Sequence, residues 1–346
     1  MNGRRIDRYE RISGAIEALD DSAVRSLLGT ATQLGHGIGG TSFRLDVEAT
    51  PVFAKCLALT DLEMRSEHVG STANYFDLPA FCHYGIGGPG FGAWRELEML
   101  GRANAAVLGG ETEMFPLTYG WRVLPGVKVG PGEELLDIDA SVAFWEGSPT
   151  VRRRLQALHD ASAAVVVLQE HIPQNLSQWL AAQLHSDGGT DTVLGTVETE
   201  LVAAVGWMSA KGWLHFDAHF DNIQADGSLY FADFGLALAD DFDLSDDERS
   251  FAAGNATYDM SYVLTYFVRW LVASMAGLDA QERDAMIAAA AEGAVPHSLP
   301  PKATELVVKY APVAALVMPF YRRLQSESRH AEYPELPVRR ALARLA

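Results

Sequence analysis

The most informative part of the sequence is WLHFDAHFDNIQADGSLYFADFG, which runs from Trp213 to Gly235. Its apolar residues are typical of short strands, yet it also contains four acids, two histidines and an asparagine. Asp and Asn often cap turns, and turn capping is the simplest interpretation. The alternative is that these polar side chains bind something charged.

The spacing of the polar residues favours the second interpretation. His215, Asp217 and Asn222 form the pattern H-x-D-x-x-x-x-N, and the tripeptide D-F-G begins at Asp233. Between them, IQADGSLYF predicts two short strands joined by an Asp-Gly turn, which would return Asp233 to Asn222. An amide oxygen beside a carboxylate suits Mg²⁺ when phosphates supply the other ligands. We expect Asn222 and Asp233 to bind Mg²⁺, with Asp217 accepting a proton from a hydroxyl.

Two motifs earlier in the chain fit a phosphate ligand. Gly35, Gly37 and Gly40 lie in a glycine-rich turn between two predicted strands, where small residues let backbone N–H groups approach phosphate oxygens. VFAK then places Lys55 between Ala54 and Cys56 in an apolar strand. Because lysine is rarely buried without a partner, this position favours a functional lysine over a surface one.

Taken in order, these motifs resemble the protein-kinase-like superfamily over roughly residues 30–275. The resemblance implies that the three glycines and Lys55 bind the phosphates of ATP, and that Asp217 and Lys55 are catalytic. It also implies a helix-borne glutamate that pairs with Lys55. Glu96 is the preferred candidate in the helix predicted over 93–108, and Glu98 is the competing choice.

Three further parts of the chain resemble parts of these proteins. LQEHIPQNL is similar to the hinge between lobes, which implies that backbone groups near Gln169, Glu170 and His171 bind adenine. Asp259 in YDMSYVL resembles the buried helix aspartate that steadies the catalytic loop. His215 is expected to brace the same loop. Phe216 stands where an arginine often precedes the catalytic aspartate, so regulation by activation-loop phosphate is not expected.

The predicted fold class is therefore α+β, as a bilobal protein-kinase-like fold with a strand-rich N-lobe, one key helix and a mainly helical C-lobe. The predicted domains are an N-terminal helical extension (1–30), a nucleotide-binding N-lobe (31–170) with insertions at 60–92 and 125–160, and a C-lobe (171–346) with the catalytic loop, metal site and acceptor site. One helix is expected over 7–30, and another is expected to kink or begin at Pro312.

The predicted function is ATP- and Mg²⁺-dependent transfer of the γ-phosphoryl group to a hydroxyl of a small molecule. His219 resembles the histidine of aminoglycoside- and choline-type kinases, although a packing role is the alternative. No A-P-E motif occurs in the 26 positions from Asp233 to Asp259. The acidic segment 240–248 suits a cationic acceptor, unless it is a solvated loop. The regular glycine turn and D-F-G keep a serine/threonine protein kinase open, and a nucleotide-binding pseudokinase module is the third possibility.

The net charge and the composition of the chain disfavour some classes of partner. The 346 residues include 27 Lys and Arg against 45 Asp and Glu, a net charge of −18 that repels nucleic acid and anionic membranes. An apolar content of 48% indicates an ordered globular protein. Two cysteines, no secretory leader pattern and no apolar run close to the roughly 20 residues of a membrane span predict a soluble, cytoplasmic protein. The sequence leaves the oligomeric state open.

Overall fold

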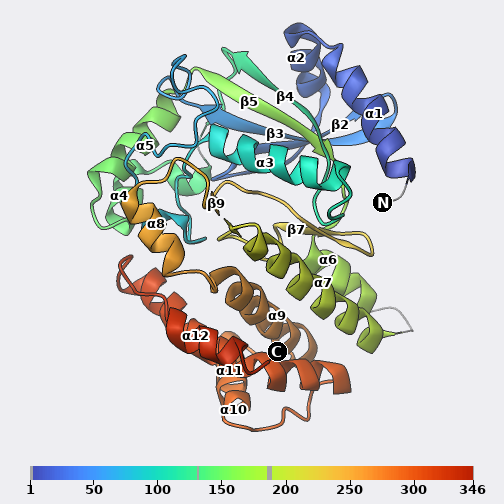
Figure 1. The fold of residues 1–346 in the computed structure, drawn as a ribbon, viewed down its shortest axis with the longest axis vertical. Helices are drawn as coiled ribbons and strands as arrows, with labels where there is room; N and C mark the ends of the chain where they lie inside the picture. The colour runs from blue at the N-terminus through green and yellow to red at the C-terminus, as the bar shows by residue number, and fades with distance from the viewer. Residues whose placement is uncertain (1–2, 131, 185–188, 346) are drawn as a thin grey trace. The chain divides into compact units, whose positions relative to one another are not determined.

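The computed structural model describes residues 3–130, 132–184 and 189–345, and the chain divides into two compact units. Unit 1 takes in the chain up to Ile172, with Tyr230–Ala237 and Asp241–Ser245. Unit 2 comprises Pro173–Leu229, Leu238–Asp240 and the chain from Asp246 onward. One unit is built on a sheet and the other is mainly helical (Figure 1), which confirms the α+β class.

The division places D-F-G in unit 1, whereas the predicted boundaries put it in the second part with Asp217. Parts of the predicted segments 1–30, 125–160 and 171–346 lie outside the described residues, namely 1–2, 131, 185–188 and 346.

A five-stranded antiparallel sheet forms the centre of unit 1, in the order β1-β2-β3-β5-β4. Its strands are β1 (Thr32–Gly37), β2 (Gly40–Val47), β3 (Thr50–Leu59), β4 (Thr118–Pro125) and β5 (Ala163–Glu170). Every residue of β5 is buried, as expected for an apolar, valine-rich central strand. Successive side chains of a strand point to opposite faces, so Lys55 faces away from Ala54 and Cys56.

Different helices cover the two faces of this sheet (Figure 1). The helices of unit 1 are α1 (Gly3–Glu17), α2 (Asp21–Thr30), α3 (Ala93–Leu108), α4 (Ile138–Phe144) and α5 (Pro149–Asp160), with 3-10 turns η1 (Ala80–His83) and η2 (Glu133–Leu135). Ile12, Ile16 and Val24 of α1 and α2 join a core with Ala54 and Cys56. Helix α3 packs on the other face, toward which Lys55 points.

The segments 60–92 and 125–160, which the sequence marks as insertions, share a second apolar core within unit 1. Phe76, Leu78, Cys82 and Phe91 from the first segment pack with Leu135, Val142, Trp145, Val151 and Leu155 from the second. The first segment is largely irregular, as expected, and the second contains α4 and α5. The two segments are therefore one packed substructure rather than two separate loops.

Unit 2 is a set of helices with short strand pairs. Its elements are α6 (Leu176–Leu184), α7 (Thr190–Ala210), β6 (Trp213–Leu214), β7 (Ile223–Ala225), β9 (Leu238–Ala239), α8 (Asp246–Ala253), α9 (Tyr258–Ala276), α10 (Ala280–Ala291), α11 (Pro301–Ser326) and α12 (Glu335–Leu342). β6 pairs with β9, and β7 pairs with β8 (Leu229–Phe231), so the hairpin predicted in IQADGSLYF is present. Helices α9, α10 and α11 pack together as the core of the unit.

The structure corrects two local predictions. The expected helix over 7–30 is broken into α1 and α2, because the Asp20 side chain accepts a hydrogen bond from Ala23 N at 2.8 Å and caps a new helix. The turn between β2 and β3 is formed by Glu48 and Ala49, whose φ angles are 47° and 59°. Helix α11 begins at Pro301, where proline suits the first helical turn, so it does not begin at Pro312. Pro312 lies inside the helix, and a kink there stays a prediction.

Helix α11 also changes the expectation about apolar runs. Among the described helices it alone is long and apolar enough by itself to cross a membrane, and half of the relevant stretch is buried within the protein. Helices α9 and α10 pass the same test only as a pair bent by 118°. Because α11 packs against α9, α10 and α7, its apolar side has the surroundings of a core helix.

Candidate functional site

Lys55 in unit 1 lies between two carboxylates that come from distant parts of the chain. Its Nζ atom donates to Glu96 Oε1 of α3 and to Asp233 Oδ1 of D-F-G, each at 2.8 Å. The pairing of Lys55 with Glu96 confirms the preferred candidate. The competing residue, Glu98, instead accepts from Arg102 one turn later in α3.

Burial and charge set the protonation of this group. Burial alone would lower the pKa of Lys55, but the charges of Asp233 and Glu96 outweigh it and hold that pKa above its ordinary value. Burial, opposed by Lys55 and assisted by Asp233, raises the pKa of Glu96 to about 6. When all three groups are ionised, one ammonium faces two carboxylates. The surplus negative charge would attract a cation.

Asp233 has an unusual backbone. Its φ angle is 63°, in the left-handed region that non-glycine residues seldom adopt. Its Oδ1 atom also accepts from Gly235 N at 3.4 Å, and the neighbouring Phe234 ring packs edge-on against Phe115. Backbone strain of this kind persists only where the surroundings impose it, and it concentrates at functional sites.

The glycine-rich turn joins β1 to β2 above the same lysine. Of the predicted phosphate contacts, Gly35 and Gly37 lie in β1, and Gly40 begins β2 opposite Gly37. A side chain on Gly40 would meet Cys56 O at 2.2 Å and would have to adopt a φ of 109°, so packing requires this glycine. A Cβ on Gly39 would instead lie 3.2 Å from Lys55 Nζ and 3.5 Å from Asp233 Oδ2.

Gly39 is therefore the site residue that sequence reasoning missed. The predicted set followed the G-x-G spacing, and only the turn geometry reveals which glycine faces Lys55. Glycine at position 39 therefore lets the turn approach the Lys55 and Asp233 side chains closely. By the chemistry of their groups, the protonated Lys55 suits a phosphate oxygen and the Asp233 carboxylate suits Mg²⁺.

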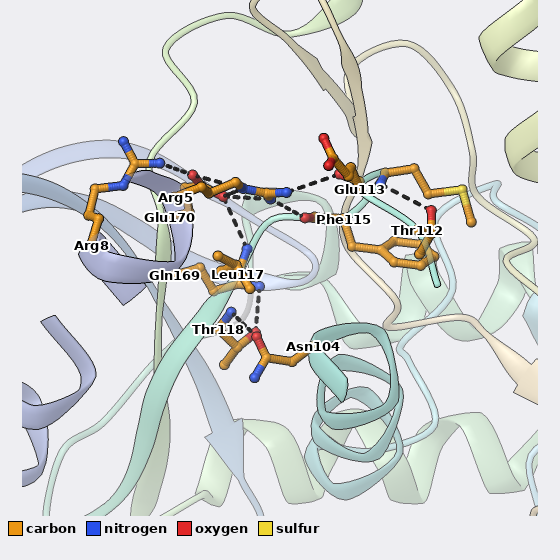
Figure 2. Close-up of polar contacts among 11 residues, drawn as sticks. Arg5, Arg8, Asn104, Thr112, Glu113, Phe115, Leu117, Thr118, Gln169 and Glu170 are labelled. Carbon is orange, nitrogen blue, oxygen red and sulfur yellow. Dashed lines mark hydrogen bonds and ion pairs between the residues drawn. The ribbon is translucent and has the colours of Figure 1, made fainter. Parts of the chain in front are cut away.

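The predicted adenine-binding stretch at the end of β5 is engaged in other contacts (Figure 2). Gln169 donates from Nε2 to Thr118 Oγ1 at 3.1 Å, and the Glu170 amide donates to Leu117 O at 2.8 Å. The N–H of Glu170 is therefore already used, and adenine would have to bind other backbone groups of this stretch. Next to it, half-buried His171 has its pKa lowered by burial and by the charge of Arg44.

The Glu170 side chain is held by the N-terminal helix. Arg5 donates to Glu170 Oε2 from Nη2 at 2.7 Å and from Nε at 3.0 Å, and Arg8 donates to Oε1 (Figure 2). Arg5 Nη2 also donates to Phe115 O at 2.6 Å. Helix α1 is thus fixed to the strand end where the hinge was predicted.

In unit 2, Asp259 holds the segment that carries Asp217. Its carboxylate accepts from His215 N at 2.6 Å and from Phe216 N at 2.8 Å, as the resemblance implied. Burial raises the pKa of Asp259 to about 6, although these hydrogen bonds oppose the shift. Phe216 has a φ of 62° and is fully buried, packing on Phe251 and Tyr258.

The predicted catalytic base has a fixed carboxylate. Asn222 Nδ2 donates to Asp217 Oδ2 at 3.0 Å and to Asp217 O at 2.9 Å, so its Oδ1 atom is the one suited to a metal. Asp217 N donates to His215 Nδ1 at 3.3 Å, which gives His215 the expected bracing role. His219 Nε2 lies 3.7 Å from Asp217 Oδ1.

Asn222 and Asp233 belong to different units, and their joint binding of Mg²⁺ stays a prediction. Within the described residues, no group of three or more His, Cys, Asp or Glu side chains is arranged to hold a metal. The metal site predicted from the sequence has two protein ligands, Asp233 and Asn222, and expects phosphate oxygens as the other ligands.

The acidic segment 240–248 is partly neutralised. Asp241 forms an ion pair with Arg102 of α3, and the Phe242 ring lies 5.1 Å from the same guanidinium. The pKa of Asp241 is held below its ordinary value by the hydrogen bond from Arg102. This part of the segment packs against α3, and the carboxylate of Asp241 is paired with Arg102.

Comparison with models of known protein families and with curated protein sequences finds no match to this chain. The functional interpretation therefore depends on the geometry of the chain itself.

Proposed function

We propose that this chain is a phosphotransferase of protein-kinase-like fold that transfers the γ-phosphoryl group of ATP to a hydroxyl of a small molecule, with Mg²⁺. The observation that carries the proposal is the convergence of Lys55, Glu96 and Asp233. A strand, a helix and the D-F-G segment, far apart in sequence, supply one residue each. If Asp233 only capped a turn, or if Lys55 were only a surface lysine, these three side chains would not need to be in contact.

ATP and Mg²⁺, when bound, would supply the transferable phosphoryl group and the neutralising charge. Lys55 would bind phosphate oxygens, because its raised pKa keeps it protonated. Glu96 would hold the ammonium in place, and the turn at Gly39 would leave room for the phosphate. Asp233 and the Oδ1 atom of Asn222 would be the metal ligands.

Asp217 would orient the acceptor hydroxyl and take its proton. Its carboxylate is held by Asn222 from one side and lies near His219 on the other, so its direction is set before substrate binds. A positioned base of this kind contributes roughly 10²–10⁴-fold to a rate.

A small-molecule acceptor is supported by His219 and by the short stretch between Asp233 and Asp259. The ion pair of Asp241 with Arg102 weakens the support for a cationic acceptor. A protein acceptor remains the second candidate because D-F-G and the glycine turn have the regular pattern of protein kinases.

The proposal is tested by incubating the protein with ATP, Mg²⁺ and a library of metabolites and antibiotics. Mass spectrometry should find a product heavier by one phosphoryl group. Asp217→Asn should lose roughly 10²–10⁴-fold in transfer while Mg-ATP binding and the melting temperature stay unchanged. Asp226→Asn, in the exposed turn of the same segment, is the matched control and should keep its activity.

Other outcomes would assign other functions. Phosphate on protein side chains without any small acceptor would identify a protein kinase. Mg-ATP binding with no transfer to any acceptor would overturn the enzyme proposal in favour of a binding module.

A further inference from the structure

Helix α3, which carries Glu96, begins without a capping side chain of its own. Its N-cap is Gly92, at a φ of 131°, and the first amides of a helix need acceptors from elsewhere. Glu63, about thirty positions earlier, supplies one: its Oε1 accepts from Ala93 N at 2.9 Å. Trp94 Nε1 also donates to Glu63 O at 2.8 Å. A side chain on Gly92 would meet Glu63 Oε1 at 2.6 Å, so the close approach requires glycine.

The Glu63 carboxylate is itself fixed by the second inserted segment. Arg154 of α5 donates from Nη1 to Glu63 Oε2 at 2.8 Å, and both side chains are 4% exposed. Thr60 donates to the same oxygen from its hydroxyl at 2.6 Å and from its amide at 3.2 Å. The Phe76 ring lies 4.9 Å from the Arg154 guanidinium. With four donors on two oxygens, the carboxylate has little freedom to turn.

The charge of this pair is well matched to its position. Burial would raise the pKa of Glu63, but the charge of Arg154 and the hydrogen bonds from Thr60 and Ala93 outweigh it and hold the pKa below its ordinary value. A negative charge at a helix N-terminus is favourable, because the first N–H groups carry partial positive charge. The ionised form of the Glu63 carboxylate is therefore the favoured one at this helix N-terminus.

One helical turn connects this cap to the site. Glu96 lies three residues after Ala93, and its side chain reaches Lys55 Nζ. Arg95 Nε donates to Thr72 O at 2.5 Å, so segment 60–92 binds the first turn of α3 a second time. A shift of this turn would move Glu96 away from Lys55, because the helix carries Glu96 whereas strand β3 carries Lys55.

We propose that Glu63 and Arg154 are positioning residues that lock the first turn of α3 and so keep Glu96 paired with Lys55. The expected effect on phosphoryl transfer rests on the proposed function. The cap itself is formed by contacts within unit 1 and does not depend on that function. It assigns a role to the segments 60–92 and 125–160: they assemble the lysine–glutamate pair from within the chain. Phosphorylation or a bound activator is then unnecessary for assembly.

The test uses the full chain with Arg154→Met, Glu63→Gln and the double variant. The matched control is Arg152→Met, which removes an exposed ion pair with Asp139 from the same helix α5. Hydrogen exchange of the α3 amides is measured first, since it needs no ligand. Arg154→Met should speed exchange at residues 93–97 at least tenfold, with β5 unchanged. The double variant, which leaves no unpaired buried charge, should restore folding stability but not full α3 protection.

Mg-ATP affinity and transfer are measured on the same proteins. Arg154→Met should weaken Mg-ATP binding and lower kcat at least tenfold, with the KM of the acceptor unchanged, and Arg154→Lys should recover part of both. Unchanged α3 exchange in a folded Arg154→Met protein, or exchange that rises evenly over unit 1, would overturn the inference. If the wild type binds no Mg-ATP, the proposed function fails. The exchange data still show whether Glu63 and Arg154 hold the first turn of α3. If Arg154→Met does not fold, the double variant, which leaves no unpaired buried charge, gives the reading at residues 93–97.

Discussion

Gly39 and Gly40 are adjacent, yet they are glycines for different physical reasons. Gly40 has no space for a side chain, because Cys56 O would lie 2.2 Å from its Cβ and its φ is 109°. Gly39 adopts a backbone open to other residues, and its Cβ would point at Lys55 Nζ and Asp233 Oδ2. Stability therefore requires glycine at position 40, whereas glycine at position 39 keeps the surroundings of Lys55 and Asp233 free of a further side chain.

Alanine at each position should separate the two roles. Gly40→Ala should lower the free energy of unfolding by more than about 2 kcal/mol, from clash and backbone strain. Gly39→Ala should leave stability within about 0.5 kcal/mol but weaken Mg-ATP binding several-fold. Gly130→Ala, with open space around its Cβ and a position outside the glycine-rich turn, is the control. Urea unfolding and calorimetric binding measure both quantities, and equal binding by wild type and Gly39→Ala would contradict the phosphate site.

The raised pKa of Glu96, about 6, predicts how nucleotide binding depends on pH. As pH falls through 6, Glu96 takes up a proton and its ion pair with Lys55 is lost. At pH 5 about nine in ten of these side chains are protonated, so Mg-ATP affinity should fall roughly tenfold from its value at pH 7. Binding titrations from pH 5 to 8 check this.

Two variants show whether Glu96 is responsible. Glu96→Gln should bind Mg-ATP weakly at pH 7 and lack this pH dependence. Glu98→Gln removes a carboxylate that pairs with Arg102 in the same helix and should behave as the wild type does. If Glu96→Gln and the wild type have the same pH profile, the titrating group lies elsewhere.

At the scale of elements, α1 is attached to the sheet by charge as well as by apolar packing. Ile12 and Ile16 join the core on one face of the sheet, while Arg5 reaches the Glu170 carboxylate at the end of β5. The side chains of Arg5 and Glu170 are 9% and 7% exposed, whereas that of Arg8 is 43% exposed. The buried arginine should therefore contribute most of the attachment.

Replacement of each arginine by methionine tests this difference. Arg5→Met leaves the buried Glu170 carboxylate short of its main partner, and should cost about 3 kcal/mol of unfolding free energy. Arg8→Met breaks an exposed contact and should cost less than about 1 kcal/mol. Urea denaturation of both variants supplies the comparison. Equal losses would show that apolar packing, and not Arg5, holds the helix.

At the scale of the whole molecule, regular patterns were easier to predict than local turns. The α+β class and α3 followed from the pattern of apolar residues, and the Lys55–Glu96 pair was implied by the resemblance, with Glu98 as the competing choice. The turn at Glu48 and Ala49 has no clear sequence signal, because neither residue is a usual left-handed former. Glu63 and Arg154 were missed because nothing local marks a cap that comes from thirty positions away.

Among the described residues, Glu96 in unit 1 and Asp259 in unit 2 are buried carboxyl groups with pKa values of about 6. Both pKa values lie above those of ordinary carboxyl groups, so the folded chain takes up these protons first as pH falls. Each group therefore adds stability as pH falls through 6, and the gain levels off below the ordinary pKa. Glu63 has the opposite sign, because its lowered pKa makes stability decline in acid.

Asp259 gives the clearest test in unit 2, because burial is the main cause of its shift. Between pH 7 and pH 5 the wild type should gain about 1 kcal/mol of unfolding free energy relative to Asp259→Asn, which cannot titrate. Asp226→Asn, in an exposed turn of the same unit, should show no such difference. Hydrogen exchange of α9 at each pH localises the effect to unit 2. A constant gap between the wild type and Asp259→Asn across this range would mean that Asp259 stays ionised, and its hydrogen bonds from His215 and Phe216 would then outweigh burial.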